Sequence, residues 1–144
     1  MLGSITLARF SEGPPITDRP SARHLRYLDE AASFYRDALN ILPDDAVSQL
    51  AVTHNLLGRA YGFAGHLERT LPHFREALRL FEASDNIYHA AQARFNLALA
   101  LLRLGRPSDA HEYAKSALLA FESLGDTAAQ QQQTRDLIAE IGRV

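Results

Sequence analysis

Histidine is the residue type in this sequence with the widest chemical repertoire, because it can bind a metal ion or transfer a proton near neutral pH. The chain has six histidines and no cysteine. No two histidines stand four residues apart, the spacing that places two zinc ligands on one face of a helix. A His-Glu-x-x-His motif and a nearby acid–histidine cluster that would supply a third ligand are also missing. We therefore expect no metal site, and we interpret the histidines as solvated or groove-edge side chains.

The other residue types that carry chemistry give no sign of catalysis. The glycines of residues 58–65 lack the preceding strand and the following Lys-Ser/Thr of a phosphate-binding loop. Ser48 and Ser84 lack the sharp turn or the placed base that activates a serine nucleophile. The adjacent carboxylates Asp44 and Asp45 fall at a helix cap, where solvation and the helix dipole account for them. We expect a protein that is not an enzyme and that needs no cofactor.

Length and composition indicate one globular domain outside the membrane. At 144 residues, 47% of them hydrophobic, a chain buries roughly 68–70% of its unfolded surface. No apolar run reaches the roughly 20 residues of a membrane helix, and residues 1–10 lack the pattern of a secretion signal. The net charge of −2 argues against a general nucleic-acid binder. We expect a cytoplasmic protein without membrane or nucleic-acid partners.

The elements that would position the polar side chains repeat along the chain at an offset of forty residues. The identities at this offset pair Leu57 with Leu97, Gly65 with Gly105, Ala77 with Ala117, Leu78 with Leu118, Phe81 with Phe121 and Glu82 with Glu122. Each unit has the apolar spacing of two helices, and a glycine between them allows the chain to reverse. Internal repetition of this kind predicts a stack of helix pairs.

The repeat divides the chain into an array and an amino-terminal segment. Residues 21–42 form the second helix of repeat one, 45–83 form repeat two, 86–124 form repeat three and 127–142 form a capping helix. Residues 1–20 are expected to form a short first helix and an inserted loop. The linkers carry Asp85 and Asp126, which can cap the helices that follow them.

These positions resemble the tetratricopeptide repeat family. One unit fills the family pattern with Leu57, Gly58, Tyr61, Gly65, Phe74 and Ala77, and the next with Leu97, Ala98, Leu101, Gly105, Ala110 and Ala117. Thr70 departs from the pattern, because a small alanine is usual there. The spacing exceeds the usual length of roughly 34 residues and is similar to the longer variety in kinesin light chains and bacterial multidomain regulators. The resemblance implies an all-α, right-handed superhelical stack of antiparallel helix pairs with a C-terminal capping helix.

In this family the first helices of successive repeats line a concave inner surface. The inward positions considered for peptide binding are Asn55, Arg59, Phe63, Gln92, Phe95, Asn96, Leu99, Arg103 and Arg135. The first helices, 46–64 and 87–104, contain no Asp or Glu, whereas the second helices carry several. The groove is therefore expected to be positive with an apolar floor, and arginine can hold a carboxylate through two hydrogen bonds.

The sequence thus favours a protein–protein interaction module that binds an acidic, partly hydrophobic segment of a partner or of another domain. Such a module could serve as the regulatory or sensor part of a larger assembly. Three alternatives remain open. The arginines could be ordinary solvated residues, the array could be a structural module that forms homodimers, or the basic inner face could contact RNA, which the weak overall charge disfavours.

Overall fold

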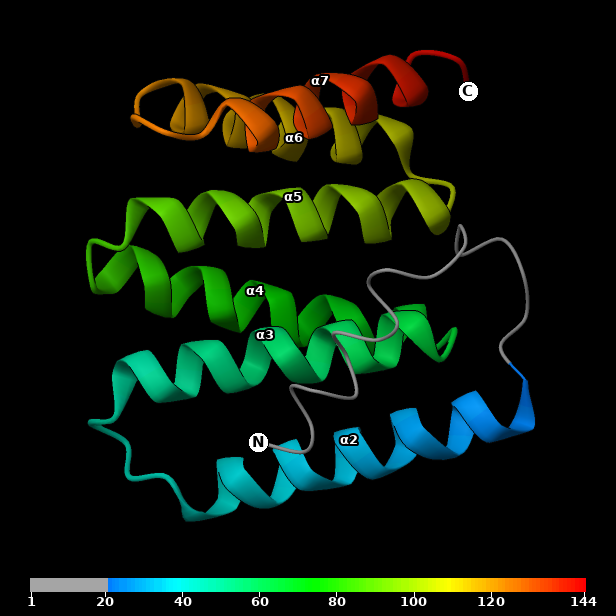
Figure 1. The fold of residues 1–144 in the computed structure, drawn as a ribbon, viewed down its shortest axis with the longest axis vertical. Coiled ribbons are helices and arrows are strands. Elements are labelled where there is room, and N and C mark those ends of the chain that lie inside the picture. Colours follow the sequence, from blue (N-terminus) through cyan, green and yellow to red (C-terminus); the bar gives the residue numbers. More distant parts are fainter. Residues whose placement is uncertain (1–20) are drawn as a thin grey trace.

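The computed structural model describes residues 21–144, and every regular element in that part of the chain is an α-helix (Figure 1). The helices are α2 (Ala22–Ile41), α3 (Val47–Phe63), α4 (Leu67–Ala83), α5 (Ile87–Arg103), α6 (Pro107–Glu122) and α7 (Ala128–Ile141). The predicted all-α fold is confirmed. The short helix and loop predicted for residues 1–20 lie outside the described residues.

The helices stack in chain order, and each packs mainly on the helix before it and the helix after it (Figure 1). Two further contacts join α3 with α5 and α5 with α7, whereas among the described helices α2 does not contact α4 and α4 does not contact α6. The first helices of the repeats therefore approach one another more closely than the second helices do. The stack curves toward the side formed by α3, α5 and α7, as helical repeat arrays do.

The core is a series of overlapping apolar clusters. Leu28, Tyr35 and Leu57 belong to a cluster between α2 and α3, and Ala51 and Phe81 belong to one that joins α3, α4 and α5. A third cluster runs through α4, α5, α6 and α7, and a fourth joins α5 with α6. No helix pair buries its apolar face alone, so the array is stabilised by contacts between neighbours.

A left-handed residue stands at each of the four turns between α3 and α7. Gly65 and Gly105 have φ angles of 87° and 75°, and Asp85 and Asp126 have φ angles of 56° and 58°. Glycine adopts this conformation freely and aspartate tolerates it better than most residues do. The prediction that the two aspartates cap the following helices is wrong, because both residues adopt the left-handed conformation of the turn. Asn86 caps α5 instead, with its Oδ1 atom accepting the His89 N–H at 3.2 Å.

Helices α3 and α4 cross closely at Gly58. A Cβ atom added to Gly58 would lie 2.7 Å from two ring carbons of Phe74, which is closer than side chains tolerate. Beside this crossing, the Thr70 hydroxyl donates to the Gly58 carbonyl at 3.2 Å. Glycine at this position therefore lets the phenyl ring of α4 lie directly against the backbone of α3.

We predict that Gly58→Ala destabilises the protein by about 1–2 kcal/mol. Overpacking against the buried Phe74 ring costs about 1–3 kcal/mol, and better helix propensity returns about 0.5–1 kcal/mol. Gly62→Ala is the control, because a Cβ atom there meets its nearest neighbour, Thr70 Oγ1, at an ordinary 3.6 Å. Urea denaturation should show a lower free energy of unfolding for the first variant and an equal or higher one for the second. Equal losses in both would contradict the close crossing.

Candidate functional site

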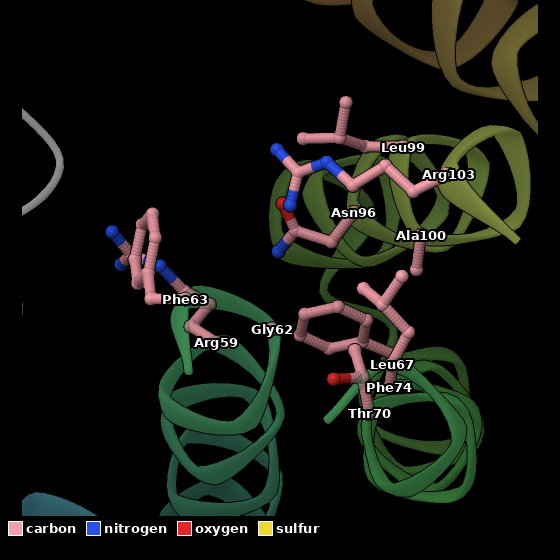
Figure 2. Close-up of a pocket in the computed structure, with 10 residues that line it drawn as sticks. All are labelled: Arg59, Gly62, Phe63, Leu67, Thr70, Phe74, Asn96, Leu99, Ala100 and Arg103. Atoms are coloured by element: carbon pink, nitrogen blue, oxygen red, sulfur yellow. The ribbon is translucent and has the colours of Figure 1, made fainter. Parts of the chain in front are cut away.

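A small hollow opens between α3 and α5, with α4 beneath it (Figure 2). It is lined by Arg59, Gly62, Phe63, Leu67, Thr70, Phe74, Asn96, Leu99, Ala100 and Arg103. The space inside is about 80 Å³, whereas a single water molecule needs about 10–15 Å³. The hollow therefore has room for one side chain of a bound molecule, and a longer ligand would extend beyond it over the surface of the stack.

Two arginines from different repeats flank the hollow. Arg59 extends from α3 beside the ring of Phe63, with its guanidinium carbon 6.0 Å from the ring centroid, and Arg103 reaches across from α5 (Figure 2). Both side chains are partly buried, and burial lowers the pKa of each guanidinium. Among the described residues neither arginine forms an ion pair, although Glu140 acts from a distance to raise the pKa of Arg103. The hollow therefore carries two positive charges, and no carboxylate of residues 21–144 forms a direct ion pair with either of them.

Two asparagines that are forty-one positions apart in the sequence join the same two helices. The Asn96 side-chain amide donates to Asn55 Oδ1 at 3.0 Å, and this bond links α5 to α3 at the edge of the hollow. The bond uses one donor of Asn96 and one acceptor of Asn55, so the Asn55 amide nitrogen and the Asn96 carbonyl oxygen keep hydrogen-bonding capacity. These two groups together could bond to a peptide backbone, which offers one acceptor and one donor per residue.

The structure brings together five of the nine residues predicted for this site. The five that line the hollow are Arg59, Phe63, Asn96, Leu99 and Arg103. A sixth predicted residue, Asn55, forms a hydrogen bond with Asn96 at the edge of the hollow.

The remaining three predicted residues lie elsewhere. Gln92 donates to the Tyr88 hydroxyl at 3.1 Å, and Phe95 packs against the core of α5, α6 and α7. Arg135 is exposed on α7, 3.8 Å from Glu122. These three side chains therefore contact other residues of the chain and do not line the hollow.

The floor of the hollow comes from α4, a second helix, whereas the predicted site drew only on first helices and on the capping helix. Leu67, Thr70 and Phe74 reach inward between the two first helices. Thr70 was a sign of this inward placement in the sequence, because the family usually has alanine at its position. Its hydroxyl donates to the Gly58 and His66 carbonyls, so its polar atom is satisfied within the protein.

Two histidines distant in sequence meet between α3 and α4. The Nδ1 atoms of His54 and His73 are 3.0 Å apart, and their rings stack with centroids 5.3 Å apart. Only one of the two nitrogens can carry a hydrogen in this contact, so at least one of the two rings is uncharged. Within the described residues no three histidine or acidic side chains gather closely enough to hold a metal ion. Expecting these two histidines to be solvated or at the groove edge was wrong, because helix packing pairs them.

Comparison with known proteins identifies the family. The tetratricopeptide repeat model matches residues 49–123, just over half of the 144-residue chain. The chain therefore belongs to the tetratricopeptide repeat family, as its repeats predicted. Members of this family are generally protein–protein interaction modules. No functionally curated protein sequence matches the chain significantly.

Solved structures show the same fold at low sequence identity. BtubC (BKLC) from P. vanneervenii is 20% identical, with a TM-score of 0.70 over 96% of this chain and 62% of its own. This chain thus spans less than two thirds of that protein. A TPR-like protein from Chlorobium tepidum TLS is 23% identical, with a TM-score of 0.65 over 97% of this chain and 94% of its own. Within residues 21–144, every helix falls short of the length and apolar character that a bilayer-spanning segment needs.

We predict that the histidine pair makes stability fall as the pH drops below about 6.5. Burial lowers the pKa of both His54 and His73, and their proximity lowers that of His73 further. The folded protein therefore binds fewer protons than the unfolded chain in this range, so acid favours unfolding. The free energy of unfolding should decrease from pH of about 7.5 to about 5.5, before carboxylates such as Glu76 begin to titrate.

The variant His54→Gln/His73→Gln is the comparison for this prediction. It retains the four other histidines but not the pair, so its free energy of unfolding should depend less steeply on pH over the same interval. A slope equal to that of the native protein would show that the pair contributes nothing to the pH dependence of the free energy of unfolding.

Proposed function

We propose that the surface around the hollow binds an extended, acidic and partly apolar segment of a partner protein or of another domain in the same assembly. One observation carries this proposal. Two partly buried arginines from successive repeats flank an apolar hollow, and neither has an ion-pairing partner among the described residues. A charge removed from water without a partner is unfavourable, so a carboxylate placed between the two guanidinium groups would recover favourable interactions.

The polar groups around the arginines suit an extended peptide. The free amide nitrogen of Asn55 can donate to a backbone carbonyl, and the carbonyl oxygen of Asn96 can accept from a backbone N–H. No Asp or Glu is present on α3 or α5 to repel an acidic ligand. The acidic side chains of the ligand would be attracted to the two arginines. An apolar side chain of the ligand would be removed from water in the hollow.

A regulatory or sensor role within a larger assembly is a further part of the proposal. A module that binds peptides acts by bringing another protein or domain into place. The cytoplasmic location expected from the sequence stays a prediction, and homodimer formation stays an alternative.

We predict that Arg59→Glu/Arg103→Glu weakens binding of an acidic peptide at least about 100-fold. A charge-assisted hydrogen bond contributes about 1.5–3 kcal/mol, and about 1.4 kcal/mol corresponds to tenfold in affinity. The probe is a fluorescein-labelled peptide, Gly-Ser-Asp-Leu-Glu-Ser-Gly, measured by fluorescence anisotropy. Binding to the native protein should also weaken as NaCl rises from about 0.05 to about 0.5 M, because salt screens the charges.

Arg75→Glu/Lys115→Glu is the matched control. It changes the net charge by the same amount at exposed positions of α4 and α6 that do not line the hollow. The affinity of this control for the probe should stay within about threefold of that of the native protein, since only the electrostatic field of the whole protein changes. Equal weakening in both double variants would show nonspecific attraction and would contradict the site.

A further inference from the structure

Gly62 lies inside a helix, and the backbone conformation at this position does not require glycine. It lies in α3 one residue before the helix ends, and only Gly65 and Gly105 among the described glycines have positive φ angles. Glycine is less favourable than alanine in a helix, because it loses more backbone freedom on folding. Local conformation therefore gives no reason for glycine at position 62.

Packing gives no reason either. A Cβ atom on Gly62 would meet Thr70 Oγ1 at 3.6 Å and Thr70 Cγ2 at 3.9 Å, which are ordinary contacts. Gly58, one turn earlier, is different, because its Cβ atom would collide with a buried ring. Forty residues later the corresponding position is Leu102, which packs partly buried against the core of α5, α6 and α7. The repeat itself therefore accommodates a large side chain at this position.

The missing side chain has one visible consequence, which is the hollow. Gly62 forms part of its wall on α3, beside the Phe74 ring, and Leu99 and Asn96 come to the hollow from α5 (Figure 2). A side chain of the size of Leu102 at this position would occupy the space between α3 and α5. We propose that Gly62 is a specificity-determining residue, which keeps the hollow open for one aliphatic side chain of the acidic segment. This inference rests on the proposed function and adds the identity of the anchoring side chain.

The lining favours an aliphatic occupant over a polar one. The floor is formed by Leu67 and Phe74, and the hydroxyl hydrogen of Thr70 is already directed to carbonyls of the chain. A carboxylate or amide oxygen at the floor would lose its water without gaining a hydrogen-bond donor. The charged groups, Arg59 and Arg103, flank the hollow, so carboxylates belong on the residues beside the anchor.

The size of the hollow sets an upper limit on the anchor. Its volume of about 80 Å³ equals roughly five to eight water-sized atoms, at about 10–15 Å³ for each. Valine, leucine, isoleucine and methionine side chains fit within this limit, whereas the indole of tryptophan exceeds it. The segment we infer is therefore a short acidic stretch with a single aliphatic residue between carboxylates.

The experiment compares peptides that differ only at the anchor. The probes are fluorescein-labelled Gly-Ser-Asp-X-Glu-Ser-Gly with X as glycine, leucine or tryptophan, measured by fluorescence anisotropy. For the native protein we expect the leucine peptide to bind at least about tenfold more tightly than the glycine peptide, since burying leucine is favourable to that degree. The tryptophan peptide should bind more weakly than the leucine peptide.

Gly62→Ala and Gly62→Leu test the role of the glycine. The alanine variant should lower the preference for leucine over glycine about fivefold or more, because its methyl group enters the occupied space. The leucine variant, which copies Leu102, should abolish the preference. Gly125→Ala, at an exposed glycine with nothing near its Cβ position, should leave all three affinities unchanged.

The possible failures are distinguishable. If leucine and glycine peptides bind the native protein equally, or if Gly62→Ala leaves their ratio unchanged, the inference about Gly62 is overturned while the acidic-segment site stands. If none of the peptides binds, both proposals fail. A thermal melt of Gly62→Ala at or above the native midpoint excludes loss of folding as the cause of a changed preference.

Discussion

The close crossing of α3 and α4 is the constraint on which the described array depends. Phe74 lies against the backbone at Gly58, and small buried residues such as Ala77 and Ala98 let neighbouring helices approach in the same way. A larger side chain at such a crossing would push the helix axes apart and change the angle between successive helices. Since every helix is placed by the one before it, an error at one crossing would be passed along the stack.

The same crossing prepares the candidate site. Bringing α4 close beneath α3 places Leu67, Thr70 and Phe74 between the two first helices, so that a second helix forms the floor of the hollow. The Asn55–Asn96 bond holds α3 and α5 at their present separation. Arg59 and Arg103 then flank the hollow, although they are separated by forty-four positions in the sequence (103 minus 59). The positive charge and the apolar surface are thus consequences of helix packing.

Sequence reasoning succeeded where the signal was periodic. The forty-residue offset predicted the helices and their order, and inward spacing selected five of the ten residues that line the hollow, as well as Asn55 at its edge. It failed where the outcome depends on three-dimensional contacts. Gln92 is bound to Tyr88, and His54 meets His73 across two helices, neither of which a linear pattern encodes. The roles of Asp85 and Asp126 were misjudged because aspartate suits both a helix cap and a left-handed turn.

The nearest-neighbour arrangement also determines how the molecule opens. The hollow is built from α3, α4 and α5 alone, while α7 is held by α6, a few contacts with α5 and the Gln130–Tyr88 hydrogen bond. Opening of α7 can therefore occur as a local event that leaves the hollow intact, because the units of such arrays contact mainly their neighbours. Amide hydrogens of α7 would then exchange with solvent faster than those of α4, while the central helices keep their arrangement.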